Sequence, residues 1–266
     1  MDERLAPKAV FLTGAGLSAD SGIRTYRGAD GYYSGMRAED LMSARTMKDN
    51  PERVHRFCDD RRREMAGYLP NEAHRAIARL AADYGDRVMH LTQNIDCMME
   101  ACDGHSSTIH LHGFLTRMRS IGNSHVVEDI GFTRYWDGLP EEAPSRGFRF
   151  RCPKSNSLFR PDVVLFGEMA PAYSKLWKAI KGLRRQDVLV VVGTQGVVLP
   201  VNQFAAGAPC FKILNNLDLG PDIDGDLFDS VLYEKAAVAA AEIESVVRER
   251  LGKPASAPHV EFGIAG

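Results

Sequence analysis

Long hydrophobic runs are missing from this chain of 266 residues. No apolar stretch approaches the roughly 18 residues that a membrane-spanning helix requires, so the sequence predicts no such helix. Residues 1–4 also lack the charged-then-apolar pattern that begins a secretory signal. We therefore expect a cytoplasmic protein that has no membrane partner.

Regularly spaced cysteine pairs are missing as well. The five cysteines stand at positions 58, 97, 102, 152 and 210, which is not the spacing of a disulfide framework. We expect them to be reduced thiols. Cys152 raises a narrower question, because a Cys-x-x-Cys metal clip would need a second cysteine where this chain has Ser155.

An excess of charge of one sign is the third absence. The formal net charge is −2, which argues against a general nucleic-acid-binding surface. The one dense basic run, residues 61–63, also fits a solvated helix face. Hydrophobic residues make up 44% and charged residues 26% of the chain, as is ordinary for a globular protein with a sizeable core.

Short apolar runs alternate with amphipathic helical patterns along the chain. Residues 9–12 read as a buried strand that leads into a glycine turn. Similar runs occupy residues 88–91, 163–166, 188–192 and 211–214, with a weaker one at 231–233. Apolar stripes at helical spacing follow Asn71, a candidate N-cap, and extend from Ala236 to Val247. This alternation predicts an α/β fold with a Rossmann-like, parallel, doubly wound sheet.

Two stretches interrupt the alternation. Residues 29–70 are polar and helix-like, and residues 114–158 are rich in glycine, proline, serine and charge without a clean period. We predict a sheet domain made of residues 1–28, 71–113 and 159–252. Residues 29–70 would form a helical insert, residues 114–158 a smaller inserted domain, and residues 253–266 a flexible tail.

The first motif is a candidate phosphate-binding loop, "TGAGLSADSGIRTYRG", at residues 13–28. A strand, a Gly-Ala-Gly turn and a helix start together present backbone N–H groups and a helix N-terminus to a pyrophosphate. Gly14 and Gly16 permit a close approach that a Cβ atom would block. Ala19 stands where the usual fingerprint has its third glycine, and a purely structural glycine turn is the alternative.

Polar residues follow the next predicted strand. Gln93, Asn94 and Asp96 would bring two amides and a carboxylate to the crevice at the carboxyl ends of the strands. The alternative is that these three residues simply cap a helix. His112, further along, is a candidate general base near neutral pH, although a single histidine is also common as a structural residue.

Together these motifs resemble the sirtuins, the NAD-dependent protein-lysine deacylases. The matching segments follow the family's order across about residues 8–250. They are Gly14-Ala15-Gly16-x-Ser18-x-x-Ser21-Gly22-Ile23, Tyr26-Arg27-Gly28, Thr92-Gln93-Asn94-Ile95-Asp96, His112-Gly113, Arg160-Pro161-Asp162-Val163-Val164, Phe166-Gly167-Glu168, Gly193-Thr194 and Asn216-Leu217-Asp218. The likeness is greatest to bacterial sirtuins that remove acetyl and acidic acyl groups, which share the form of residues 22–27.

The resemblance implies NAD-dependent removal of acyl groups from protein lysines, giving nicotinamide and O-acyl-ADP-ribose. It implies three catalytic residues, with His112 as the general base on a ribose hydroxyl and Asn94 and Asp96 at the nicotinamide end; His110 is expected to be structural. It also implies a set of NAD-binding residues: Gly14, Ala15, Gly16, Ser18, Ser21, Gly22, Ile23, Tyr26, Arg27, Gln93, Asn94, Ile95, Asp96, Gly193, Thr194, Gln195, Asn216, Leu217, Asp218 and Ala237. Gln195 is a departure, because serine is commoner there.

The acyl-lysine substrate would bind along residues 163–168. The resemblance implies that this segment pairs with the substrate backbone, through Val164, Phe166, Gly167 and Glu168. In relatives that act on succinyl- and malonyl-lysine, a tyrosine and an arginine three residues apart on a helix bind the acyl carboxylate. Here Cys58 and Arg61 stand at those positions. The arginine suits a carboxylate, whereas Cys58 opens the pocket to larger neutral acyl groups or is a small core residue.

The family's structural zinc marks the largest departure. Sirtuins usually carry two cysteine pairs in the small domain, with the spacing of a tetrahedral zinc site. The matching positions here are Ser120, Asn123, Cys152 and Ser155, so one thiol of four remains. His125 is at best one substitute ligand, and we therefore expect no structural zinc and no other metal.

Two further functions remain open from the sequence. One is an NAD hydrolase or ADP-ribosyltransferase on the same fold. The other is a non-catalytic module that binds NAD. The presence of His112 together with Asn94 and Asp96 favours catalysis on acyl-lysine proteins or peptides, with no nucleic acid as a partner.

Overall fold

The computed structural model describes residues 6–26, 38–102, 108–132, 158–218, 220 and 222–254. Within these residues, parallel strands form a six-stranded sheet in the order β3-β2-β1-β7-β8-β9. The strands are β1 (Ala9–Thr13), β2 (Val88–Thr92), β3 (Thr108–His110), β7 (Val188–Val192), β8 (Phe211–Asn216) and β9 (Ser230–Tyr233).

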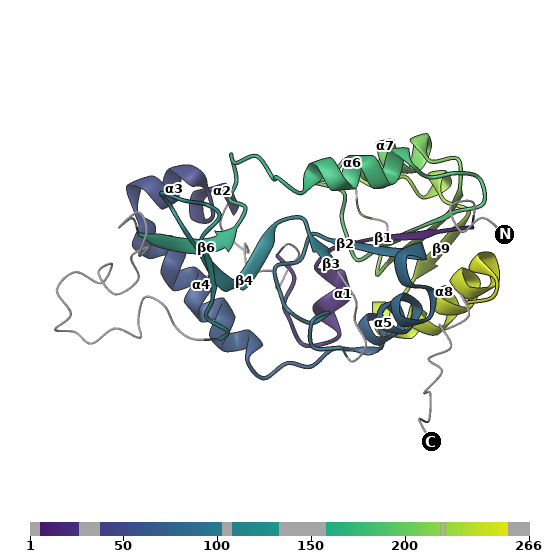
Figure 1. Cartoon of the computed structure of the whole chain (residues 1–266), viewed down its shortest axis with the longest axis horizontal. Coiled ribbons are helices and arrows are strands. Elements are labelled where there is room, and N and C mark those ends of the chain that lie inside the picture. The colour runs from purple at the N-terminus through teal and green to yellow at the C-terminus, as the bar shows by residue number, and fades with distance from the viewer. Residues whose placement is uncertain are drawn as a thin grey trace, which may run out of the picture.

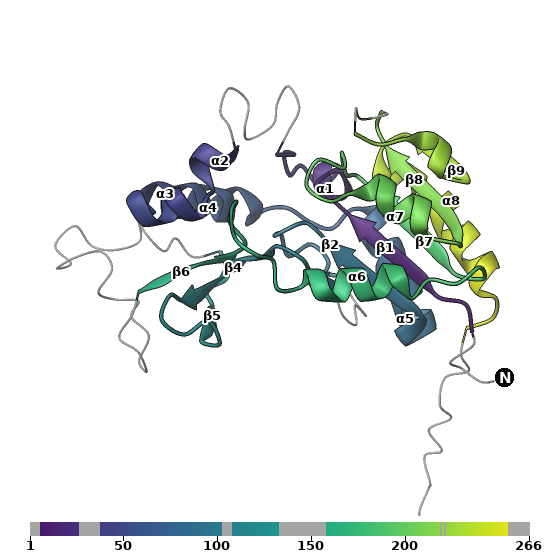
Figure 2. The same ribbon diagram turned by 90° about the horizontal axis from the view of Figure 1, so that it is seen from above.

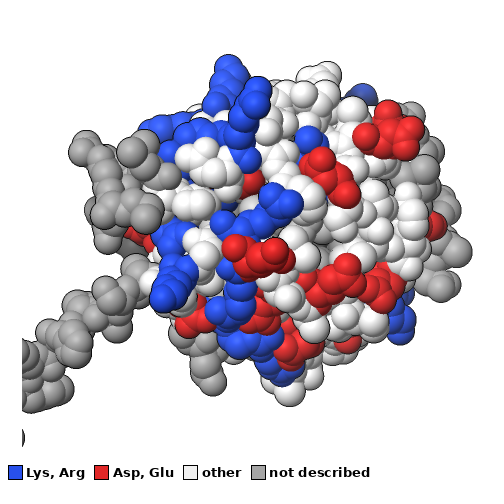
Figure 3. Space-filling view, turned by 90° about the vertical axis from the view of Figure 1, so that its right-hand side faces the viewer, with Lys and Arg blue, Asp and Glu red and all other residues white. Residues whose placement is uncertain are grey.

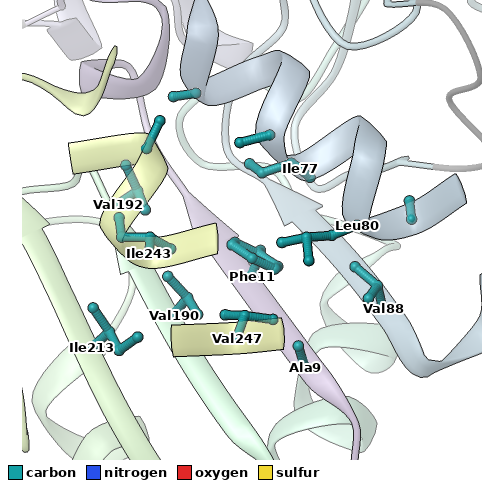
Figure 4. Packing of buried hydrophobic residues seen from close by; sticks show 14 of the residues in the cluster. Ala9, Phe11, Ile77, Leu80, Val88, Val190, Val192, Ile213, Ile243 and Val247 are labelled. Carbon is teal, nitrogen blue, oxygen red and sulfur yellow. The ribbon is translucent and has the colours of Figure 1, made fainter. Parts of the chain in front are cut away.

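Helices cover both faces of this sheet (Figure 1). The helices α5 (Glu72–Tyr84) and α8 (Ala236–Leu251) lie on one face, and α6 (Tyr173–Lys181) and α7 (Val201–Gly207) lie on the other. Successive residues of a strand point to opposite faces, so Phe11 packs under α5 and α8 (Figure 4) while Leu12 packs toward α6 and α7. Burial on both faces explains the unbroken apolar runs and confirms the predicted doubly wound sheet.

Helix α5 begins where the sequence predicts its cap. The Asn71 side chain accepts the N–H groups of Ala73 and His74, at 2.9 and 3.4 Å, and the Nδ1 atom of His74 accepts the N–H of Asn71 at 3.2 Å. This reciprocal arrangement is a capping box, which satisfies donors that the first helical turn leaves without partners. The same asparagine donates to the carbonyl of Leu17 at 2.8 Å, so it also fixes the chain beside the first glycine turn.

The two predicted inserts come together as one small lobe beside the sheet (Figure 2). It contains α2 (Ala38–Leu41), α3 (Ala44–Asp49) and α4 (Pro51–Met65), with an antiparallel sheet of β4 (Gly113–Ser120), β5 (Val127–Asp129) and β6 (Phe159–Val163) in the order β5-β4-β6. Val54 and Met65 of α4 pack against Leu115 and Val163 in its core. Short helices at α1 (Gly16–Ala19), Gly85–Arg87 and Gly225–Leu227 complete the described elements.

Residues 159–166 correct the prediction from the sequence, which placed residues from 159 onward in the sheet domain and residues 163–166 in a strand of the parallel sheet. Instead, β6 pairs antiparallel with β4, so that Gly113 lies opposite Val163 and Ser120 lies opposite Phe159. A short apolar run indicates a buried strand but not the sheet to which it belongs. The sequence analysis also missed β3, β4 and β5, because three-residue strands and a strand that carries Arg117 and Arg119 show no clean apolar signal.

Among the described residues, no helix combines the length and the apolar character needed to cross a bilayer. Basic and acidic side chains lie next to one another on the face shown in Figure 3, which suits a chain with a net charge of −2. Of the predicted tail, residues 255–266 lie outside the described residues.

Candidate functional site

A cavity of about 500 Å³ opens where the carboxyl ends of the strands meet the small lobe. Strand order runs in opposite directions on the two sides of β1, and crevices for ligands form at such a point in open parallel sheets. The turns after β1, β2, β7 and β8 supply one wall, with Gly14, Ala15, Gly16, Gln93, Asn94, Ile95, Gly193, Thr194, Gln195, Asn216, Leu217 and Asp218. The remaining cavity lining includes Tyr26, His112 and residues 163–168. It also includes residues that belong to none of the sequence motifs.

The first glycine turn is built against the turn after β7. The N–H of Gly14 donates to the carbonyl of Val192, and the N–H of Gly16 donates to the carbonyl of Gly193, both at 2.9 Å. A Cβ atom on Gly14 would lie 2.6 Å from the carbonyl oxygen of Gly193, and a Cβ atom on Gly16 would lie 2.5 Å from the Cα atom of Gly193. The two turns therefore meet through bare backbone, and the N–H groups of Gly14 and Gly16 are used in that contact.

A buried hydrogen-bond network lies behind this turn, centred on Ser18. Its hydroxyl donates to Asp96 at 2.8 Å and accepts from the Asn94 side-chain amide at 3.1 Å. The Nε2 atom of His74 lies 3.2 Å away; it carries the proton, because Nδ1 of the same ring accepts the N–H of Asn71. Burial lowers the pKa of His74 to about 4, so this ring is neutral at pH 7.

Asp96 completes the network beside a small second pocket and does not line the main cavity. Its carboxylate accepts the N–H of Met98 at 3.1 Å as well as the Ser18 hydroxyl. Burial raises the pKa of Asp96, and the two hydrogen bonds oppose that rise. The network therefore fixes the loop that carries Asn94, whose side chain is 5% exposed, at the edge of the cavity.

His112 has the hydrogen bonds of a general base. Its Nδ1 atom lies 2.9 Å from the carbonyl of Gln93, which can only accept, so Nδ1 carries the proton and Nε2 is left as the basic nitrogen. Burial lowers the pKa of His112, and the bond to the carbonyl acts in the opposite direction. The ring is therefore neutral near pH 7 with Nε2 exposed to the cavity, where it meets the hydroxyl of Tyr173 at 2.9 Å.

His110 points away from this chemistry. Its Nδ1 atom lies 3.0 Å from the carbonyl of Asn94, and its Nε2 atom lies 2.9 Å from the Glu100 carboxylate. The two histidines thus hold the consecutive carbonyls of Gln93 and Asn94. This is the structural position that the sequence analysis expected for His110.

Hydrogen bonds from the Asn216 side chain to the backbone of Thr194 join the turns after β7 and β8. The Asn216 side chain accepts the N–H of Thr194 at 3.0 Å and donates to its carbonyl at 2.9 Å. The Gln93 side chain donates to the Thr194 hydroxyl at 3.0 Å. These bonds hold three strand ends in one wall of the cavity and orient their backbone toward it.

Residues 163–168 cross from the small lobe into the cavity wall. The N–H of Val164 donates to the carbonyl of His112 at 2.9 Å, and the N–H of Phe166 donates to the carbonyl of Met42 at 2.8 Å. Glu168 is bound by Arg160 through both carboxylate oxygens and accepts the N–H of Leu165 at 2.9 Å. Burial would raise the pKa of Glu168, but these bonds outweigh it and hold that pKa below its ordinary value.

Several predicted site residues lie elsewhere. Cys58 is fully buried in the core of the small lobe, where burial raises its pKa to about 12, and it does not line the cavity. Arg61 lies in a small pocket next to the Ser18 network and donates to Glu64 at 2.7 Å. The N–H of Ala237 donates to Asp20 at 3.0 Å, at the start of α8. Arg27 lies outside the described residues.

Three more predicted NAD-binding residues shape the loop after α1 without lining the main cavity. The Ser21 hydroxyl accepts from Asn71 at 3.1 Å, Gly22 has a φ of +92° beside Tyr68, and Ile23 is buried in the lobe core. The cavity has further lining residues that the sequence did not predict: Thr25, Met42, Ala170, Tyr173, Val197, Val198 and Gly220.

The first pair of positions that would hold a zinc ion is engaged in a hydrogen-bonded turn. The Ser120 hydroxyl accepts the N–H of Asn123 at 3.2 Å, and the side-chain oxygen of Asn123 accepts the N–H of His125 at 3.1 Å. Hydroxyl and amide oxygens are poor zinc ligands in any case. The described residues hold no group of three or more metal-binding side chains, and Cys152 and Ser155 lie outside them.

Comparison with known proteins gives one family. Residues 14–200 match the Sir2 family. A protein from Campylobacter jejuni named "NAD-dependent protein deacylase" is 32% identical over 234 residues, which cover 88% of this chain and 92% of the relative. A protein of the same name from Escherichia coli (strain K12) is 34% identical over 239 residues, covering 89% of this chain and 80% of the relative. A solved Sir2 homolog–NAD complex superimposes with a TM-score of 0.75 at 30% identity, covering 94% and 93% of the two chains.

Proposed function

Because this chain belongs to the Sir2 family, we propose that it removes acyl groups from protein lysines and consumes NAD in doing so. The observation that carries the proposal is the neutral His112, whose basic Nε2 faces the same cavity as the first glycine turn and Asn94. A base and a glycine turn thus line one cavity, in a fold that a solved Sir2 homolog–NAD complex shares.

The residues at the strand ends fit NAD. Gly14, Ala15 and Gly16 line the cavity without bulky side chains, which leaves room for the pyrophosphate beside this turn. Asn94 lines the part of the cavity that would take the nicotinamide, and its amide is held by the network that contains Asp96. When bound, NAD supplies the ribose carbon that accepts the acyl oxygen as nicotinamide leaves. His112 would act as the base for a ribose hydroxyl, with Nε2 as its basic nitrogen, and the Gln93 carbonyl holds the ring in the tautomer that this requires.

The acyl-lysine segment of a protein substrate enters along residues 163–168. The Val164 N–H bonds to the carbonyl of His112 and the Phe166 N–H bonds to the carbonyl of Met42, so one edge of residues 164–166 is fixed. The segment then turns, with the N–H of Glu168 donating to the carbonyl of Leu165. A peptide that pairs with the other edge would bring its lysine to His112. The apolar side chains of Met42, Leu165 and Val197 around the cavity favour a neutral acyl chain.

Mass spectrometry of the protein with NAD and a panel of lysine peptides tests the proposal. The panel carries acetyl, butyryl, longer neutral and succinyl groups. We expect deacylated peptide together with O-acyl-ADP-ribose, and no turnover in a His112→Ala variant that still binds NAD. Nicotinamide release with every peptide unchanged would instead support an NAD hydrolase or ADP-ribosyltransferase, and NAD binding without any product would support a binding module.

We also infer that the small lobe is held without zinc. Packing and buried charge supply its support: Arg62 of α4 pairs with Asp59 and donates to the carbonyl of Leu115 on β4, at 2.8 Å. Elemental analysis of the purified protein is expected to find no stoichiometric zinc. The unfolding midpoint should be the same with and without a strong chelator, and a drop on chelation would show that a metal holds the lobe.

A further inference from the structure

The hydroxyl of Tyr173 occupies the side of His112 that faces the cavity. Its oxygen lies 2.9 Å from Nε2, and both side chains line the cavity. The ring centroids are 5.8 Å apart and the planes are inclined at 54°, so the two residues meet through the hydroxyl and the nitrogen rather than by stacking face to face.

The direction of this hydrogen bond follows from the other ring nitrogen. Because Nδ1 donates to the Gln93 carbonyl, neutral His112 has a lone pair but no proton at Nε2, and the Tyr173 hydroxyl is the donor. A nitrogen of this kind has one lone pair, and it is already in use. A hydroxyl that approaches His112 from the cavity therefore meets the tyrosine oxygen, which still has lone pairs with which to accept a proton.

Tyr173 is the first residue of α6, and this helix is firmly anchored. Leu176 and Ile180 are buried in the core beneath it. Trp177, one turn after Tyr173, meets the ring of Phe204 on α7 edge to face, with centroids 4.9 Å apart. The hydroxyl is thus held at His112 by packed secondary structure rather than by a loop.

We propose that Tyr173 and His112 act together as the base. Tyr173 gives its proton to Nε2 while its oxygen takes the proton of the substrate hydroxyl. The hydroxyl's O–H bond and the original tyrosine O–H bond break, an N–H bond and a new tyrosine O–H bond form, and the positive charge rests on His112. The imidazolium then donates from Nε2 to the tyrosine oxygen, a charge-assisted bond that stabilises it.

Tyr26, Glu168 and Asp218 are titratable residues that line the same cavity as the pair, and Glu168 is bound by Arg160. On β6, which pairs with the strand after His112, Asp162 lies 3.9 Å from Arg119.

The identity of the substrate hydroxyl in this proposal rests on the proposed deacylase function. The hydrogen bond between Tyr173 and His112 does not depend on that function.

The first test needs neither NAD nor peptide. NMR titration of the imidazole C–H signals in the complete protein gives the pKa of His112, with a His112→Gln variant to identify the signal. Tyr173→Phe keeps the ring and removes the acceptor of the imidazolium, so we expect the pKa of His112 to fall by about half to one pH unit. Tyr84→Phe is the matched control, because its hydroxyl bonds to the Gly252 carbonyl at 2.8 Å, away from the cavity.

The pKa of His112 is expected to be the same in Tyr84→Phe and the unaltered protein. If Tyr173→Phe also leaves it the same, the two residues do not share a proton and the proposal is overturned. This result stands whether or not the protein proves to be a deacylase.

The second test separates the two stages of the reaction. Since the base acts after nicotinamide has left, Tyr173→Phe should lower the formation of deacylated peptide about 10- to 100-fold. Exchange of labelled nicotinamide into NAD, which needs only the first stage, should persist. An equal loss of both activities, or faster deacylation, would contradict the shared base. Absence of deacylation in the unaltered protein would refute the proposed function instead.

Discussion

Single glycines allow the turns after β1 and β7 to meet. Gly14 and Gly16 on one turn touch Gly193 on the other, and each contact is closer than a side chain allows. The sequence motif reads as a ligand loop, but the protein's own backbone imposes the same requirement. A substitution there should therefore disturb folding as well as NAD binding.

We predict that Gly14→Ala lowers the free energy of unfolding by about 1–3 kcal/mol, because the new methyl group overlaps the Gly193 carbonyl. Urea unfolding at equilibrium measures this change. Gly207→Ala is the control: this glycine ends α7 with no atom near its potential Cβ, so stability should stay the same or rise by up to about 1 kcal/mol. Equal stability of the two variants would show that the turns can move apart.

Among the elements, α5 does more than cover the sheet. Its cap residue Asn71 reaches back to the Leu17 carbonyl and the Ser21 hydroxyl, so the start of α5 also fixes the loop that follows α1. A second asparagine, Asn50, caps α4 by accepting the N–H of Arg53 at 3.2 Å and lies in the small lobe. Comparing the two asparagines therefore separates the effect of helix capping from the effect of holding the loop after α1.

We predict that Asn71→Ala lowers stability by about 1–2 kcal/mol and weakens NAD binding, since both the cap and the loop contacts are lost. Asn50→Ala should lower stability by about 0.5–1 kcal/mol and leave NAD affinity unchanged. Thermal unfolding and calorimetric NAD titration measure the two effects. The same NAD affinity in both variants would show that Asn71 does not support the loop.

The elements also show how far the sequence can be read. Strands with unbroken apolar runs, such as β7, and helices with strong periodicity, such as α5, were predicted correctly because burial on both faces or on one face determines their residues. The pairing partners of the strands were not all predicted correctly, as β6 shows, because strand pairing depends on contacts between residues far apart in the chain. Nothing in the sequence indicated the role proposed for Tyr173. A tyrosine in a predicted helix is interpreted as a core residue unless its contact with His112 is known.

For the molecule as a whole, the neutral buried histidines couple folding to pH. Burial lowers the pKa of both His55 and His74 to about 4, whereas an unfolded chain holds histidine near 6.5. Between these values the unfolded state binds more protons, so stability falls as the pH drops from about 6.5 to about 4. Above about pH 7.5 both residues are almost wholly neutral in either state and contribute little pH dependence.

We predict that the protein loses about 2–5 kcal/mol of stability between pH 7 and pH 4.5 through these two residues, as measured by urea unfolding at each pH. His74→Gln should reduce the slope, although the variant is less stable at pH 7 because it loses the bond to Ser18. His125→Gln, at an exposed position, should leave the slope unchanged. A slope that is unaltered in His74→Gln would show that this ring is not buried as a neutral group.

The small lobe is assembled from two stretches of chain with β2 of the large sheet between them. During synthesis, α4 leaves the ribosome with an apolar face whose partners, β4 and β6, have not yet been made. The lobe can therefore fold only after β6 has emerged, and the cavity against it is complete only after β8 and the turn that carries Asp218 have followed. A chain that ends before β6 would expose the apolar face of α4 and become a target for chaperones and proteases. A premature end would therefore also destabilise residues that lie before it.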